Sequence, residues 1–215
     1  LVPGLTNDSR DQYTRIFCEY AYKDYGFRAC IFNRRGYAGM AFRKNEIDPI
    51  TWNKFDDLDQ VVNFVHETFP LANIYLAGTS MGANFIQRYA GMKGQQNLPV
   101  IPKALGCISS PFCLKAGTKN INSKRLIRFV MTKSLLQTFT AHLHDERFNA
   151  ALQQKNIDVK HVMASTSSDE FNERFSMAFT EYPTLDDYKE GVSSRAFIRH
   201  IPIPTLSVNS KNDEV

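Results

Sequence analysis

Residues 78–82 read Gly78-Thr79-Ser80-Met81-Gly82, a G-x-S-x-G sequence flanked by apolar segments. The preceding run, Ile-Tyr-Leu-Ala-Gly at 74–78, is typical of a buried strand, and an apolar helix is predicted to begin near Ala83. Where a strand turns directly into a helix, small residues are needed two positions before and after the central residue, because the two backbones approach closely. Glycine occupies both positions. The stretch predicts a nucleophile elbow that exposes the Ser80 hydroxyl; the alternative is a glycine-rich turn with an inert serine.

Strand-like and helix-like patterns alternate on both sides of this stretch. Apolar residues recur at helical spacing over 8–25 and 55–69, and Gly26 and Pro70 are suited to end these helices. Short apolar runs predict buried strands at 28–32, 104–109 and 205–208. Such alternation predicts a mostly parallel sheet with flanking helices, in the α/β class.

The spacing of apolar residues along the chain changes between about residues 111 and 194. Helical patterns are found at 125–136, 138–153 and 169–179, without a clear strand. A long helical insertion between two sheet strands is typical of a lid over an active site, although a decorative subdomain would have the same pattern. We expect one α/β domain over residues 1–215, incomplete at both ends, with this helical lid inserted.

Composition excludes several classes of protein. The chain is 43% hydrophobic and 22% charged, which is ordinary for a folded domain and excludes disordered or fibrous chains. The net charge of +4 comes from scattered lysines and arginines, so no nucleic-acid partner is expected. The four cysteines (Cys18, Cys30, Cys107 and Cys113) lack metal-ligand spacing and predict reduced, buried thiols in a reducing compartment. No apolar stretch reaches the roughly 20 residues of a membrane span.

A serine nucleophile of this kind needs two backbone N–H donors for the oxyanion of its intermediate. Met81 follows the serine and is expected to supply one. The loop Pro3-Gly4-Leu5-Thr6 is placed to supply the other through Leu5, although Pro3-Gly4 is also compatible with an ordinary turn.

The remaining catalytic groups are an acid and a base, in the chain order serine, acid, histidine. Asp213 follows the predicted strand 205–208 and is the expected acid, whereas Asp186 and Asp187 lie in a polar helical stretch typical of a solvated face. All five histidines precede Asp213, so the base is expected beyond Val215, outside this chain. The 215 residues alone should then be nearly inactive, since loss of a triad member costs about 10⁶-fold in kcat.

These residues together resemble one branch of the α/β-hydrolases, which contains the mammalian abhydrolase-domain phospholipases and the yeast medium-chain fatty-acid ethyl ester synthases. The matching segments run in order over essentially the whole chain: 3–9, 32–37, 77–84, 170–175, 187–188 and 204–210. The resemblance implies Ser80 as nucleophile, Asp213 as acid, and Leu5 and Met81 as oxyanion donors. The chain departs from the family pattern at Asn7, where the family usually has glycine, and at Asn172 and Asn212, where the family usually has aspartate.

The resemblance implies hydrolysis of carboxylic esters with medium or long acyl chains, in acylglycerols or phospholipids, without a metal or organic cofactor. It also implies an intracellular enzyme held at a membrane by an N-terminal segment that this chain lacks. Two alternatives stay open: an alcohol O-acyltransferase that uses the same acyl-enzyme, and a non-catalytic binding protein that kept the fold.

Overall fold

The computed structural model describes residues 1–42, 52 and 54–211. Three parallel strands pair in the order β1-β2-β3: β1 (Tyr75–Thr79), β2 (Ala104–Ile108) and β3 (Thr205–Val208). Register is continuous, with Tyr75 opposite Ala104 and Leu105 opposite Thr205. The strands predicted at 74–78, 104–109 and 205–208 are thereby confirmed to within a residue.

Two N-terminal segments extend the sheet beyond β1. Val2 forms an isolated parallel bridge to Gly78, and its N–H donates to Ala77 O at 2.8 Å. On its other side, the Leu1 amino group donates to Cys30 O at 2.7 Å, and Phe32 N–H donates to Leu1 O at 2.9 Å. The predicted buried strand at 28–32 is wrong as stated: only Phe32 is buried, and these backbone bonds do not build a named strand.

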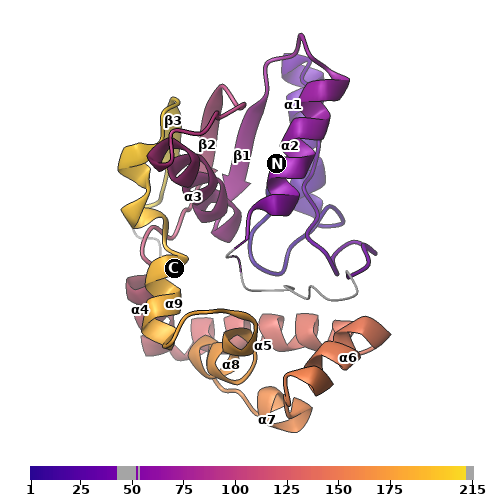
Figure 1. The fold of residues 1–215 in the computed structure, drawn as a ribbon, viewed down its shortest axis with the longest axis vertical. Helices are drawn as coiled ribbons and strands as arrows, with labels where there is room; N and C mark the ends of the chain where they lie inside the picture. Colours follow the sequence, from indigo (N-terminus) through magenta and orange to yellow (C-terminus); the bar gives the residue numbers. More distant parts are fainter. Residues whose placement is uncertain (43–51, 53, 212–215) are drawn as a thin grey trace.

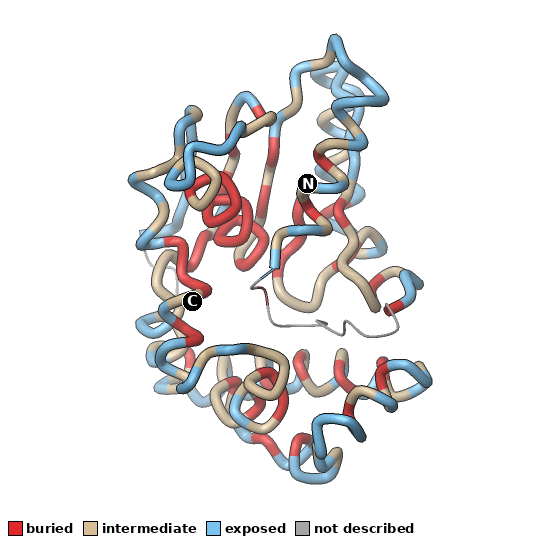
Figure 2. The backbone as a smooth tube through the Cα atoms, viewed as in Figure 1, coloured by how far each residue is buried: buried red, intermediate tan, exposed pale blue. Residues whose placement is uncertain are grey.

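Two amphipathic helices lie beside the N-terminal edge of the sheet (Figure 1). Helix α1 (Gln12–Tyr25) begins four residues later than its pattern predicts and ends at Gly26, whose φ of 68° is the left-handed conformation that glycine adopts at helix ends. Helix α2 (Asp56–Thr68) matches the predicted span closely. Helix α3 (Met81–Gln95) follows β1 directly and is buried continuously from Met81 to Gly91, as the tube in Figure 2 makes visible.

The predicted helical insertion is helical throughout and gathers at one end of the sheet (Figure 1). It contains α4 (Leu114–Ser123), α5 (Arg125–His142), α6 (Glu146–Gln154), α7 (Val159–Met163), α8 (Ser168–Arg174) and α9 (Leu185–Gly191), with a 3₁₀ turn at Ser176–Phe179. Two further 3₁₀ turns, Ser194–Ala196 and Ile198–His200, lead from the insertion to β3. Side-chain oxygens cap α6, α7, α8 and α9 at their first turns, which explains why these short helices begin where they do: Asp145, Asp158, Ser167 and Thr184.

Two apolar cores hold the molecule together. One packs α2 and α3 against the sheet around Ile86, Leu105 and Val62. The other joins α5, α6 and α8 around Phe139, whose ring lies edge-on to Phe148, Phe171 and Phe175. Leu5 packs against both clusters, so the loop after Val2 lies where the two cores meet.

The cysteine prediction is correct in part. All four thiols are free, but only Cys107 is buried, where desolvation raises its pKa to about 11. Cys30 is exposed, because the segment 28–30 lies at the surface instead of inside the sheet. None of the helices in the described ranges is long and apolar enough to cross a membrane.

Candidate active site

Ser80 occupies the sharp turn between β1 and α3, as its sequence context predicts. Its backbone has φ 51° and ψ −123°, a conformation that L-residues rarely adopt and that stores strain at functional sites. Neighbouring glycines make this turn sterically feasible. A Cβ on Gly78 would lie 2.6 Å from Gly82 O, and a Cβ on Gly82 would lie 2.1 Å from Val2 O. Both positions therefore require glycine for the strand and helix to approach.

The backbone holds Ser80 while its side chain stays available. The Ser80 N–H donates to Ile108 O at 2.8 Å, which ties the turn to the end of β2. Although Ser80 is the N-cap residue of α3, its hydroxyl makes no capping hydrogen bond. The residue is half-buried and lines a pocket, so its Oγ faces space that a ligand can occupy.

The loop 3–7 lies against this turn. A Cβ on Gly4 would come within 3.3 Å of both Ser80 Cβ and Thr79 O, so the loop backbone approaches the serine closely. A tight turn follows, in which Asn7 N–H donates to Gly4 O at 3.2 Å and Thr6 has φ 63°. No hydrogen bond from the Leu5 N–H is found among the described residues, and the Met81 N–H opens α3, where helices leave donors unpaired. These are the two donors predicted for an oxyanion.

Two contacts fix the loop from outside. Thr6 Oγ1 and Ser134 Oγ on α5 share a hydrogen bond of 2.7 Å, which links the loop to the helical insertion. Behind the loop, Asp8 accepts bonds from the Arg10 side chain and from Ala38 N–H at 3.0 Å. Burial alone would raise the pKa of Asp8, but these hydrogen bonds outweigh it and lower the pKa below its usual value. Asp8 is thus a charged anchor for the loop.

The loop that begins at Asn33 serves the same anchoring purpose. Asn33 Oδ1 accepts from Ser9 N–H at 2.9 Å, and Asn33 Nδ2 donates to Ser9 Oγ at 2.9 Å. Arg34 stacks over the Trp52 ring at 3.9 Å. The segment 33–36 therefore supports the site from its edge and does not line the pocket.

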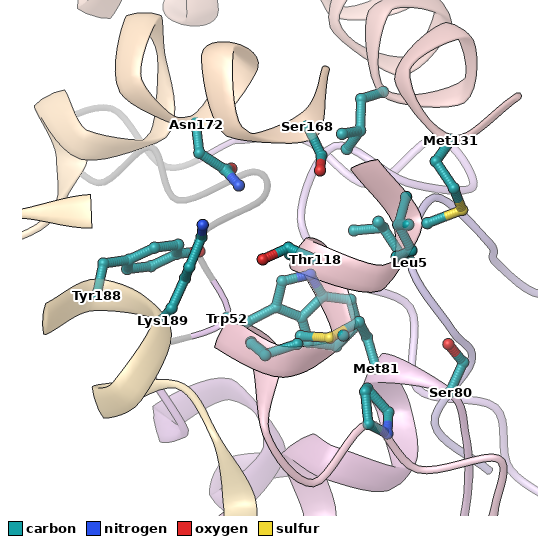
Figure 3. A pocket seen from close by; sticks show the side chains of 15 residues that line it. Leu5, Trp52, Ser80, Met81, Thr118, Met131, Ser168, Asn172, Tyr188 and Lys189 are labelled. Atoms are coloured by element: carbon teal, nitrogen blue, oxygen red, sulfur yellow. The ribbon is translucent and has the colours of Figure 1, made fainter. Parts of the chain in front are cut away.

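The pocket in front of Ser80 encloses about 720 Å³ of empty space, part of it open to solvent. Figure 3 shows Ser80 at one side, with side chains of the helical insertion across from it. Most of its lining is apolar: Leu5, Trp52, Met81, Pro111, Leu114, Ile121, Met131 and Leu135. No group of three or more potential metal-binding His, Cys, Asp or Glu side chains occurs within the described ranges.

Comparisons with known proteins agree with this geometry. A family model described as "alpha/beta hydrolase fold" matches residues 1–100, which include the loop 3–7 and Ser80. Bovine "Phospholipase ABHD3" is 32% identical over 220 residues, covering 99% of this chain and 49% of the relative. The resemblance to the abhydrolase-domain α/β-hydrolases is confirmed by these matches. The fold-class prediction is confirmed.

Other abhydrolase-domain relatives match over the same extent. Human "Phospholipase ABHD3" is 29% identical over 99% of this chain and 50% of its own length. Human "Monoacylglycerol lipase ABHD2" is 25% identical over 99% of this chain and 51% of its own length. The chain therefore spans about half the length of the curated relatives it matches.

The predicted acid and base of this hydrolase domain stay predictions. Asp213 lies outside the described residues, as does Asn212. Asp186, the alternative carboxylate, is exposed and paired with Lys115 at 2.6 Å, as expected of a solvated face. No histidine lines the pocket. His142 is buried, but its ring packs on Tyr37 and Phe42, and desolvation lowers its pKa to about 4.

Sequence reasoning missed a polar group at the pocket wall opposite Ser80. Lys189 lines the pocket and pairs with Asp169 at 2.8 Å, although both stand in charged runs that resemble solvated helix faces. Tyr188, two positions after Asp186, is also buried. In the sequence, the aromatic Tyr188 within this charged run was the signal that the short helix turns a face inward.

Proposed function

We propose that this domain is the catalytic part of a serine hydrolase that cleaves carboxylic esters of medium- or long-chain acyl lipids. The observation that carries the proposal is the strained Ser80, held at an elbow with its hydroxyl facing an apolar pocket. Strain of this kind persists where function requires it, and an inert turn would not need it. The relatives' names, phospholipase and monoacylglycerol lipase, favour lipid esters over other acyl compounds.

In the proposed reaction, Ser80 Oγ attacks the ester carbonyl carbon and a histidine accepts the hydroxyl proton. The carbonyl oxygen becomes an oxyanion, which the N–H groups of Leu5 and Met81 stabilise. Collapse of this intermediate breaks the ester bond, and the histidine returns the proton to the leaving alcohol. Water then hydrolyses the acyl-enzyme by the same steps. Asp213 orients the histidine, which in this proposal comes from sequence outside these 215 residues.

The helical insertion, residues 111–194, is the proposed lid. Its helices supply most of the pocket wall, from Leu114 on α4 to Lys189 on α9. Its hydrogen bond from Ser134 to Thr6 joins the lid to the loop that carries Leu5. Movement of α5 would therefore act directly on the proposed oxyanion donor.

We also propose that the domain works against a lipid surface, through the outer face of α5. Leu126, Phe129 and Val130 are 75%, 61% and 55% exposed, and they lie on one helical face. The whole helix contains three lysine or arginine residues and no acidic one, and Lys133 Nζ lies 5.9 Å from the Phe129 ring. An exposed apolar face surrounded by positive charge is suited to an anionic membrane. It would supplement the membrane anchor that the family resemblance implies.

Vesicle co-sedimentation tests this surface. Phe129→Glu should reduce binding to vesicles that contain anionic phospholipid by about tenfold or more, since it removes apolar area and adds repulsion. Phe64→Glu is the matched control, because Phe64 is 66% exposed on α2, away from the lid. Equal binding of the two variants would contradict the proposal.

Hydrolysis itself is tested with the full-length protein that contains this chain. Monoacylglycerols and phospholipids with a series of acyl chain lengths are assayed for fatty-acid release. Ser80→Ala should abolish release, whereas Ser123→Ala, at an exposed serine outside the pocket, should keep it. Ethyl ester formation in the presence of ethanol would favour the acyltransferase alternative. Release that is unaffected by Ser80→Ala would overturn the proposal.

A further inference from the structure

The side of the pocket opposite Ser80 in Figure 3 is polar, whereas most of the remaining lining is apolar. Three polar side chains converge there from α8 and α9: Ser168, Asn172 and Lys189. Figure 3 shows them opposite Ser80, with Trp52 and Thr118 between the two sides. We call these three residues the donor wall. Hydrolysis at Ser80 does not require a polar group at this distance, so the donor wall needs its own explanation.

Lys189 is a buried cation held in place by a carboxylate. Its side chain is 8% exposed, and its Nζ lies 2.8 Å from Asp169 Oδ1. The other carboxylate oxygen, Asp169 Oδ2, accepts from Asn122 Nδ2 at 2.9 Å. An ammonium group donates up to three hydrogen bonds, so a single carboxylate oxygen does not exhaust its capacity. The remaining capacity is on the pocket side, since Lys189 lines the pocket.

The other two members of the donor wall also direct donors into the pocket. Ser168 is 7% exposed, and its buried Oγ has no hydrogen-bond partner among the described residues. Asn172 Oδ1 accepts from Ser176 Oγ at 2.9 Å, which leaves the amide NH₂ group directed toward the cavity in Figure 3. A buried polar group without a partner is destabilising, and a ligand in the pocket that accepts from Ser168 Oγ would relieve this cost.

We propose that the donor wall binds the phosphate group of a phospholipid substrate. A phosphodiester carries a negative charge and only accepts hydrogen bonds, which matches an ammonium, an amide NH₂ and a hydroxyl that converge. A neutral glycerol head group lacks this charge, so the Lys189 ammonium gains less from binding it. This inference rests on the proposed function and deepens it: the apolar wall holds an acyl chain, and the polar wall selects the head group.

Binding of non-hydrolysable ligands tests the proposal without requiring catalysis. The probes are an alkyl-ether glycerophosphocholine and an alkylglycerol of the same chain length, titrated calorimetrically into full-length Ser80→Ala protein. Adding Asn172→Leu or Ser168→Ala should raise the Kd of the phosphocholine ligand about tenfold. The Kd of the alkylglycerol should change less than about threefold. Both substitutions leave the Lys189–Asp169 pair intact, so they avoid exposing an unpaired buried charge.

Lys189→Met, combined with Asp169→Asn, tests the cation itself. It should raise the Kd of the phosphocholine ligand further, relative to the Kd of the alkylglycerol. Lys115→Met is the matched control, because the Lys115–Asp186 pair also ties α9 to a neighbouring helix, here α4, but is exposed and outside the pocket. Equal weakening of both ligands by the donor-wall variants would overturn the head-group assignment. Tight binding of inorganic phosphate alone, lost in the same variants, would also overturn it and identify a free-anion site.

The hydrolase proposal fails separately from this one. If the unmodified protein releases no fatty acid from either ester class, the reaction is refuted, and selective loss of phosphocholine binding would still establish the donor wall. If both ester classes are cleaved and the binding ratio does not respond to Asn172→Leu, the donor wall is refuted and the reaction stands.

Discussion

Replacing Gly82 with alanine should destabilise the protein, although alanine favours helices. Gly82 is the second residue of α3, where the intrinsic preference would give alanine an advantage of about 1 kcal/mol. The added Cβ would lie 2.1 Å from Val2 O and 2.4 Å from Pro3 O, both backbone atoms. Since real Cβ contacts are not found below 3.0 Å, the segment around Val2 would have to retreat by about 0.9 Å.

The retreat has an energetic cost that the contacts allow us to bound. Val2 is fully buried and exchanges two backbone hydrogen bonds with β1, from its N–H to Ala77 O at 2.8 Å and from Thr79 N–H to its O at 3.2 Å. Overpacking costs about 1–3 kcal/mol, and each weakened hydrogen bond about 1 kcal/mol more. We expect a net loss of about 2–4 kcal/mol in the free energy of unfolding. Because loop 3–7 moves with Val2, kcat should fall about 10²-fold.

Chemical denaturation followed by circular dichroism measures this loss. Gly106→Ala is the matched control, since Gly106 lies in β2 and a Cβ there would have no neighbour within 4 Å. That variant should be as stable as the unmodified protein or slightly more stable, because glycine weakens strands. If Gly82→Ala unfolds at the same denaturant concentration as Gly106→Ala, the close approach of loop and elbow is refuted.

Three further predictions concern the groups around the loop and the lid. Desolvation lowers the pKa of His142 to about 4, so between about pH 6.5 and 4 the unfolded chain binds a proton that the folded chain does not. The free energy of unfolding should therefore fall by up to roughly 3 kcal/mol over this range. His142→Phe should flatten this dependence of the unfolding free energy on pH, as measured by chemical denaturation. Burial would raise the pKa of Asp8, but its hydrogen bonds outweigh burial and lower the pKa in the folded protein. The charged Asp8 therefore stabilises the fold above pH 3.8, and this stabilisation is lost as the pH falls through the lowered pKa. Asp8→Asn should reduce the free energy of unfolding by about 1–3 kcal/mol at neutral pH. Thr6→Ala and Ser134→Ala should be coupled by about 0.5–1.5 kcal/mol in a double-mutant thermal denaturation cycle, and additive losses would show that lid and loop are independent.

The elbow and its flanking elements could be predicted because their physics is local. Two glycines around Ser80, an apolar run before it and an apolar helix after it leave few other ways to fold, and the observed β1 and α3 agree within two residues. The segment 28–32 shows the limit of such reasoning. Its apolar run satisfies a strand pattern, but the burial of a strand depends on neighbours that local sequence does not reveal.

The donor wall could not be predicted because burial of Lys189 is a tertiary property. Its helix is short and charged, with Asp186 and Glu190 exposed, and only its packing against α4 and α8 turns the lysine inward. The role of Leu5 could be predicted only from the expected α/β context around Ser80, since a proline–glycine turn has no catalytic pattern of its own. What locates it beside Ser80 is the pairing of Val2 with β1, a contact between residues 76 positions apart.

Labelling with a fluorophosphonate probe tests the central claim most directly, because the probe reacts covalently only with an activated serine. Full-length protein is labelled, digested and mapped by mass spectrometry. The account predicts one adduct on the peptide that contains Ser80, lost in Ser80→Ala and retained in Ser123→Ala. Absence of an adduct on folded protein, or equal labelling of Ser80→Ala, would contradict the assignment of Ser80 as the nucleophile.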